Sequence, residues 1–362
     1  MTSHTSRNCS GKSSRRRSSQ VCKIQENTDT SADRDVAHEL NEEVIHIMKL
    51  AQKSLLASPL QMALNSAHGI AFHRGLGTPL YSTSSTLMTK YLDAQGIAEF
   101  SDVAYAKSNI AVVANGASHS EFSKWVGEFF SEIGSSSTKL SGAPSKYYGG
   151  EERIAHDSAN VMILAFPGSS SFTAGSSFKP EISVLAALLG GESSIKWSPG
   201  FSLLSKASSH YQHAHVSTQN AAYSDAGLFH VTITGNPRHI AKASKNVVDT
   251  LKKVAAGEVA EEDIKKATAL AKFRALEAGQ NIDTGLEATG NGLISGGKPY
   301  QIDEVGSAIE KVSQDKVISV SYTMCFSLNS KLTAPRPPKH YLTLELPFRP
   351  SGTCSSCHSP KT

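Results

Sequence analysis

The sequence predicts an α+β fold made of two related modules. Two short apolar stretches, 160–168 and 227–235, are typical of strands, and longer stretches with apolar residues at helical spacing lie on both sides of them. Strands followed by helices within one unit indicate a sheet covered by a helical layer. A pair of helices that recurs in both halves indicates that this unit occurs twice.

The first half consists mainly of predicted helices. Apolar residues near helical spacing predict a helix from residue 37, and Ser58 and Pro59 end it before a second helix at 59–74. Further helices are expected at 89–106 and 120–134, with a short apolar strand at 109–116. Residues 135–150 are dense in Ser, Gly and Pro and are interpreted as a linker.

The second half begins with predicted strands. We expect them at 152–157, 160–168, 211–218 and 227–235, with an apolar helix at 178–191 between the second and third. Two long helices follow, at 236–257 and 260–280. The first starts with Asn-Pro, and the second starts with three acids, which favour a helix N-terminus.

The two halves share a sequence repeat. Residues 40–69 and 260–292 both start with acids, break after about sixteen residues and end in a second helix closed by glycine. Residues 91–113 and 300–320 match again. About 110 residues of strand and helix precede the shared helix in the second half, but 40 residues precede it in the first. We therefore expect one module truncated at its N-terminus and one truncated at its C-terminus.

These observations predict five segments. They are a disordered basic flank at 1–36, an incomplete first module at 37–134, the linker at 135–150, a second module at 151–320 and an irregular tail at 321–362. The basic flank is rich in Ser and Arg and lacks acids, as mitochondrial transit peptides do. It has no apolar face, so disorder is the favoured interpretation and a targeting role is the alternative.

Composition narrows the class of protein. The net charge of +4 comes largely from the first 23 residues, and the near balance of the remainder argues against a nucleic-acid-binding surface. No apolar run approaches the length of a membrane-spanning helix, so membrane association is expected only through partners. The five cysteines lie in the flanks, which fits a reducing compartment: Cys9, Cys22, Cys325, Cys354 and Cys357.

Five stretches between residue 37 and about residue 320 carry a family resemblance: HELNEEV, KLAQKSLLASPLQMALNSAHGIAFHRGLGTPL, TKYLDAQGIAEF, AYAKSNIAVVANGA and ALEAGQNIDTGLEATGNGLISGGKPY. In these stretches the chain resembles the pitrilysin family. This family includes mitochondrial processing peptidase, insulin-degrading enzyme and the core subunits of mitochondrial respiratory complex III. The chain is similar to the core subunits in particular. The resemblance implies two α/β sandwich modules.

The resemblance implies a structural role in ubiquinol-cytochrome c reductase. We expect a non-catalytic core subunit, peripheral on the matrix side of the mitochondrial inner membrane, that pairs with core protein 1 and supports cytochrome b, cytochrome c1 and the iron-sulfur protein. No cofactor is expected. The alternatives are the alpha-type subunit of mitochondrial processing peptidase, which binds presequences, and an active zinc metallopeptidase.

The zinc site of active family members has no counterpart in the sequence. Those enzymes hold zinc with His-x-x-Glu-His and a distant acidic ligand. The chain contains no such stretch, and the equivalent helix of the second module, 178–191, has no histidine. The third-ligand position falls near Leu50, which cannot bind zinc. We therefore predict no catalytic, metal-binding or cofactor-binding residues.

Three other patterns have a structural explanation. His213 and His215 would project from one strand face near His210, but no acid or thiol is spaced to complete a metal site. GLISGGK at 292–298 has phosphate-loop spacing, yet a predicted helix precedes it and Pro299 follows, so a helix-ending turn is expected. A group with helical spacing is explained by the preference for acids at a helix start: His38, Glu39, Glu42 and His46.

The stretch CSSCH, from Cys354 to His358, fits the pattern that attaches a c-type haem. Attached haem needs an apolar pocket and usually a second axial ligand from the following chain. SPKT alone follows the motif here, and PFRPSGT precedes it. We interpret the match as accidental, in a disordered tail.

Overall fold

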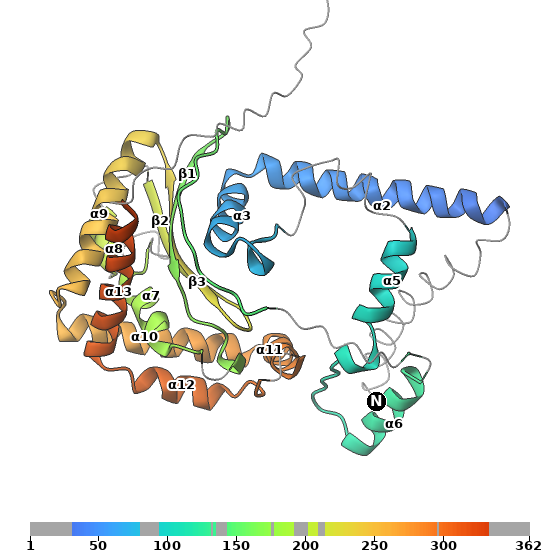
Figure 1. Ribbon diagram of the computed structural model, residues 1–362. Helices are drawn as coiled ribbons and strands as arrows, with labels where there is room; N and C mark the ends of the chain where they lie inside the picture. Colours follow the sequence, from blue (N-terminus) through green and yellow to red (C-terminus); the bar gives the residue numbers. More distant parts are fainter. Residues whose placement is uncertain are drawn as a thin grey trace, which may run out of the picture.

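The computed structural model (Figure 1) describes residues 31–79, 94–131, 133–134, 143–174, 177–191, 202–208, 214–294 and 297–332. Its strands form one antiparallel sheet in the order β1-β3-β2. They are β1 (Asn160–Pro167), β2 (Ala214–Ala222) and β3 (Gly227–Gly235). β3 is buried along most of its length because it lies between the other two strands. The predicted strands at 160–168 and 227–235 are confirmed.

Helices cover the two faces of this sheet unequally. α7 (Pro180–Leu189), α8 (Leu203–Ser208), α9 (Pro237–Ala255) and α13 (Gln314–Leu332) lie on one side. α10 (Glu261–Gln280) and α12 (Ile302–Glu310) pack on α7 as an outer layer. α3 (Pro59–Phe72) lies on the opposite side of the sheet (Figure 1). α11 (Ile282–Ile294) follows α10 and contacts the short helix η3 (Phe172–Ala174).

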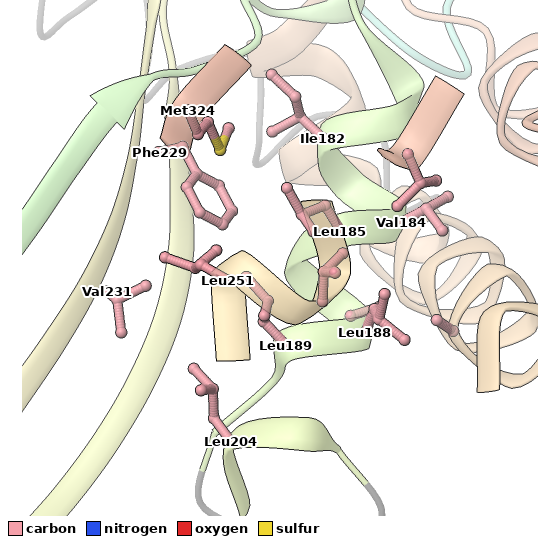
Figure 2. Packing of buried hydrophobic residues seen from close by; sticks show 14 of the residues in the cluster. Ile182, Val184, Leu185, Leu188, Leu189, Leu204, Phe229, Val231, Leu251 and Met324 are labelled. Atoms are coloured by element: carbon pink, nitrogen blue, oxygen red, sulfur yellow. The ribbon is translucent and has the colours of Figure 1, made fainter. Parts of the chain in front are cut away.

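The main core lies between the sheet and α7. Phe229 and Val231 of β3 face the helices, and Figure 2 shows Leu251 of α9 between the sheet and α7. Nearly all of α7 is apolar and buried, including Leu185 and Leu189. α9 begins at Pro237 after Asn236, whose side chain accepts a hydrogen bond from the Arg238 amide. Five buried apolar residues then follow its sheet-facing stripe: Ile240, Ala243, Val247, Leu251 and Val254.

The first half of the chain contributes helices and short turns. α2 (Ser31–Ala57) leads into α3, and Ser58 caps α3 by accepting a hydrogen bond from the Gln61 amide. After the one-turn helix η1 (Gly75–Gly77) come α5 (Ala94–Ala104), η2 (Lys107–Asn109) and α6 (His119–Phe129). The helix break predicted at residues 58 and 59 is confirmed.

Two predicted strands are wrong. Residues 110–118 have no regular structure, and 152–157 form an irregular segment. A strand requires a hydrogen-bonded neighbour, and within the described ranges β1, β2 and β3 pair with one another and not with these segments. Residues 152–157 instead contact the first half: Ser66 donates a hydrogen bond to Glu152, and a ring nitrogen of His156 lies 2.9 Å from the Leu56 carbonyl oxygen.

Helices extend past both of the segment ends expected at residues 36 and 320. α2 begins at Ser31, inside the expected disordered flank. α13 continues to Leu332, inside the expected irregular tail. Val317, Ser321 and Met324 recur at spacings of four and three residues, so they form one buried stripe. Ser321 is tolerated in this stripe because its hydroxyl donates to the Val317 carbonyl at 2.9 Å.

Candidate functional site

The family resemblance compares α7 and α2 with the zinc-binding helices of active members. α7 presents buried aliphatic residues where a zinc helix would present histidines. Leu50 lies on α2 with 53% of its surface exposed. Among the described residues, no group of three or more His, Cys, Asp or Glu side chains could hold a metal ion.

The other histidine patterns are only partly described. His215 lies on the exposed face of β2 opposite Thr234 of β3, whereas His210 and His213 lie outside the described residues. His46 is exposed on α2; His38, Glu39 and Glu42 belong to the same helix, but their side chains are outside the described set. The Cys354–His358 motif is also outside it. The predicted haem interpretation therefore stays a prediction.

The described part of the glycine stretch, residues 292–294 and 297–298, packs against η3. Residues 292–294 are the last residues of α11, which ends at Ile294, so the stretch contains the predicted helix end. The Gly297 amide donates to the Gly292 carbonyl at 2.8 Å, and the Lys298 amide donates to the Thr173 carbonyl at 2.9 Å. The Lys298 ammonium pairs with Glu304 at 2.9 Å and lies 3.8 Å from the centroid of the Phe172 ring. These contacts fix the turn against a neighbouring loop.

That neighbouring loop, residues 167–174, is the serine-rich stretch after β1. Ser169 and Ser170 are buried, and the Ser169 hydroxyl accepts a hydrogen bond from the Lys179 amide at 2.8 Å, next to the start of α7. Asn220 of β2 accepts from the Ser169 amide at 3.0 Å and donates to the Ser169 carbonyl at 3.1 Å. The Ser171 amide donates to the Tyr223 carbonyl at 2.8 Å. The loop is therefore anchored on both sides.

The interface between α3 and the sheet carries a polar cluster that sequence patterns did not predict. The Nδ1 atom of His68 lies 2.8 Å from the Leu64 carbonyl oxygen, and Nε2 lies 2.7 Å from the Tyr223 hydroxyl. Because a carbonyl only accepts, Nδ1 of His68 donates, and in the neutral ring Nε2 accepts from Tyr223. His230 of β3 is buried in the same interface.

Burial shifts the pKa values of two groups of this cluster in opposite directions. It lowers the pKa of His230, because the charged imidazolium loses solvation; the hydrogen bond with the Leu228 carbonyl opposes this, and the charge of His68 lowers the pKa further. Burial raises the pKa of Tyr223, because the phenolate is the charged form. The interface thus favours a neutral imidazole at residue 230 and a protonated phenol at residue 223.

Residues 143–150, interpreted from the sequence as part of a linker, fasten α3 to the sheet. The Tyr148 amide donates to the Ala71 carbonyl at 2.7 Å, and the Tyr147 hydroxyl donates to the Ala165 carbonyl of β1 at 2.9 Å. The Tyr147 ring meets Phe72 edge-on with centroids 6.2 Å apart. Two adjacent tyrosines in a stretch otherwise dense in Ser and Gly were the available sequence signal.

The sequence of the chain is similar to those of known proteins. Residues 91–270 match the family described as the peptidase M16 inactive domain. A protein named cytochrome b-c1 complex subunit 2, mitochondrial, from Neurospora crassa is 46% identical over 281 residues, which cover 77% of this chain and 60% of that protein. The chain is homologous to subunit 2 of the cytochrome b-c1 complex.

Other relatives agree with this homology. The subunit 2 protein of Cryptococcus neoformans is 33% identical and matches 76% of this chain and 63% of its own length. A mitochondrial-processing peptidase subunit alpha-2 from Dictyostelium discoideum is more distant, at 27% identity over 72% of this chain and 58% of that protein. The chain thus spans about three fifths of the length of these subunit 2 relatives.

The fold is also found among solved structures. A chain of complex III2 from Candida albicans superposes with a TM-score of 0.63 and 15% identity, covering 77% of this chain and 67% of that one. Together with the family match, this likeness gives the chain a peptidase M16-like fold of mixed helices with a small antiparallel sheet. Within the described residues, no helix is long and apolar enough to cross a membrane.

Proposed function

We propose that the chain is a non-catalytic core subunit of the mitochondrial cytochrome b-c1 complex, ubiquinol-cytochrome c reductase. The observation that carries the proposal is the 46% identity to a protein named as subunit 2 of that complex. In this role the chain supports the electron-carrying subunits and transfers no electrons itself. Its place would be peripheral, on the matrix side of the inner membrane.

The absence of peptidase activity is supported by side chains as well as by homology. The matched family model is that of the inactive domain. A zinc hydrolase needs three protein ligands and an open coordination position. The aliphatic residues of α7 and the exposed Leu50 of α2 offer no ligand, so a hydrolytic centre of the family type cannot form on these helices.

The proposal extends to the arrangement of the chain in two related modules, at 37–134 and about 151–320. An offset of 220 residues pairs Val44 of α2 with Ile264 of α10, and Ile47 with Ala267. Ile264 is 5% exposed in the layer where α10 packs on α7, whereas Val44 is 50% exposed. This contrast supports a first module whose helix α2 lacks a counterpart of α7 among the described residues.

The second helix of each pair gives an independent comparison. Counted from the closing glycines Gly69 and Gly292, Ala71 of α3 corresponds to Ile294 of α11. Ala71 is buried against the sheet, but Ile294 is 56% exposed. Exposed aliphatic residues at both α2 and α11 are unfavourable in water and are typical of surfaces that become buried in assemblies. We propose that they contact other subunits, core protein 1 among them.

The alternative function is that of a presequence-binding alpha-type subunit of mitochondrial processing peptidase. The similarity to the mitochondrial-processing peptidase subunit alpha-2 of Dictyostelium discoideum supports this alternative. By the family resemblance, that subunit carries a glycine-rich loop in its second module. The serine-rich loop after β1, which is only loosely similar, is held by Asn220, Lys179 and Tyr223. These contacts favour the structural role.

Assembly in mitochondria tests the choice between the two functions. The tagged full chain would be expressed in a fungal strain that lacks its own subunit 2, and membranes would be solubilised mildly and separated on native gels. We expect the chain to migrate with cytochrome b and haem c, with ubiquinol oxidation restored. Migration with an active presequence-cleaving fraction that lacks cytochrome b would instead establish the alternative.

A further inference from the structure

His230 occupies an unusual position for a titratable residue. It lies on the central strand β3 and faces α3, on the same side of the sheet as Leu228. Its side chain is buried, and its Nδ1 atom lies 3.5 Å from the Leu228 carbonyl oxygen, a long hydrogen bond. A charged imidazolium at this position would therefore be poorly solvated and weakly compensated.

Among the described residues, the groups around His230 do not supply a compensating negative charge. Its neighbours across the sheet are Ala165 on β1 and Gln219 on β2. The titratable side chains on the other elements packed in this interface are His68 on α3 and Tyr223 after β2, which bond to each other.

Three further titratable groups of the region form hydrogen bonds at its border. Tyr147, before β1, donates its hydroxyl proton to a backbone carbonyl. The carboxylate of Glu152 accepts a hydrogen bond from Ser66, and that of Asp225 accepts from the Ser145 amide at 2.7 Å. Protonation of His230 would therefore add a positive charge beside another histidine.

The two faces of the sheet differ in how much apolar packing would resist opening. On the helix-covered face, residues of α7, α8, α9, α10, α12 and α13 join β1, β2 and β3 in the main core. On the α3 face, the buried apolar cluster consists of Ala71, Phe72 and Leu228, with a few half-buried neighbours. Local opening follows the face with the least buried apolar contact, so water reaches His230 most readily by separation of α3 from the sheet.

We propose that the α3–sheet interface is a pH-dependent latch, in which protonation of His230 releases α3 and the first half of the chain while the sheet and its helical layer stay folded. A neutral His230 holds the latch closed. An acidic shift opens it, because the imidazolium must reach water.

The direction of the pH effect follows from the linkage between protonation of His230 and opening of the interface. The pKa of His230 is lower in the closed state than the ordinary value of about 6.5 that applies once the residue is solvated. The closed state is fully favoured above that ordinary value, and its advantage declines as pH falls from there toward the lowered pKa. For one proton, the ratio of closed to open molecules changes by up to about tenfold for each pH unit within that window.

Hydrogen exchange detected by mass spectrometry tests the latch on the full chain. Exchange would be measured between pH 5.5 and 7.5 and corrected for the intrinsic pH dependence of amide exchange. We expect peptides from α3 to lose protection several-fold at the acidic end, while peptides from α7 and α10 keep theirs. Simultaneous loss of protection in α3 and α7 would overturn the proposal, since it would indicate global unfolding.

Variants separate His230 from other titrating groups. His230→Gln keeps a donor but cannot charge, so the protection of α3 should become independent of pH in this range. His215→Gln, on the exposed face of β2, is the matched control and should behave like the unmodified chain. Persistent pH dependence in His230→Gln would refute the latch.

A second variant keeps the test decisive if His230→Gln fails to fold. His68→Gln removes the neighbouring charge that lowers the pKa of His230. The pKa of His230 should then rise toward its ordinary value, and the pH dependence of α3 protection should shrink. An unchanged or larger pH dependence in His68→Gln would contradict the proposal.

Discussion

Asn220 and Ser169 are joined by two hydrogen bonds that run in opposite directions. The Asn220 side chain accepts from the Ser169 amide at 3.0 Å and donates to the Ser169 carbonyl at 3.1 Å. A side-chain amide thus replaces the backbone partner that a strand would supply after β1 ends at Pro167. This pair carries much of the order of the serine-rich loop, because both backbone groups of Ser169 depend on one residue.

We expect Asn220→Ala to destabilise the chain by about 1–3 kcal/mol, because it leaves two partly buried backbone groups without a partner. The free energy of unfolding would be measured by urea titration. Gln219→Ala, at an exposed residue of the same strand, is the control and should change stability by less than about 0.5 kcal/mol. Equal effects of the two substitutions would show that the Asn220 pair does not anchor the loop.

Gly227 should tolerate no side chain. A Cβ atom added there would overlap the backbone of Ser169, which the Asn220 pair and the core prevent from moving. We expect Gly227→Ala to cost about 1–3 kcal/mol through overpacking.

Gly127 provides the contrast, since a Cβ atom there would meet nothing within 4 Å inside helix α6. Gly127→Ala should therefore raise stability by about 0.5–1 kcal/mol. Thermal unfolding of both variants measures the two expected changes in stability. A Gly227→Ala chain as stable as the unmodified one would mean that the loop can shift freely.

The elements that were predicted correctly from the sequence have strong local patterns. α9 has a stripe of buried apolar residues and a capping Asn236, and β3 is a mostly apolar strand that is buried along most of its length. Residues 109–116 show the limit of such patterns. Their apolar composition suits a strand, but a strand also needs a neighbour, and pairing between distant segments leaves no mark on a single sequence.

The polar interface of α3 could not be predicted for a similar reason. His68, Tyr223 and His230 are far apart along the chain and belong to no motif. Their proximity depends on the packing of a first-half helix on a second-half sheet. The end of α13 was missed because Ser321 and Cys325 interrupt a stripe whose burial becomes evident only against α9 and α7.

The thiol of Cys325 should react slowly in the folded chain. Partial burial raises its pKa, and the nearby cation of Lys252 opposes this shift. Since the thiolate is the reactive form, alkylation by iodoacetamide near pH 8 should be several-fold slower than in urea. Mass spectrometry of the Cys325 peptide gives the rate. Lys252→Gln should slow the reaction further, and a faster reaction in that variant would contradict the assigned cause.

The exposed aliphatic face of α2 should matter for assembly more than for folding. Ile47 is 64% exposed, so Ile47→Lys should change the stability of the isolated chain by less than about 0.5 kcal/mol. If this face contacts another subunit of the cytochrome b-c1 complex, the same substitution places a charge in an apolar interface. We then expect a several-fold loss of the chain from the assembled complex on native gels.

Phe273 on α10 provides a matched control for Ile47. It is 61% exposed, so Phe273→Lys makes the same change of charge on an equally accessible helix position. α10 already packs on α7 and α12 through its other side, and its residue 273 is not part of the faces assigned to partners. Phe273→Lys should therefore leave assembly unchanged. Normal incorporation of Ile47→Lys, or an equal loss with Phe273→Lys, would remove α2 as a specific contact surface.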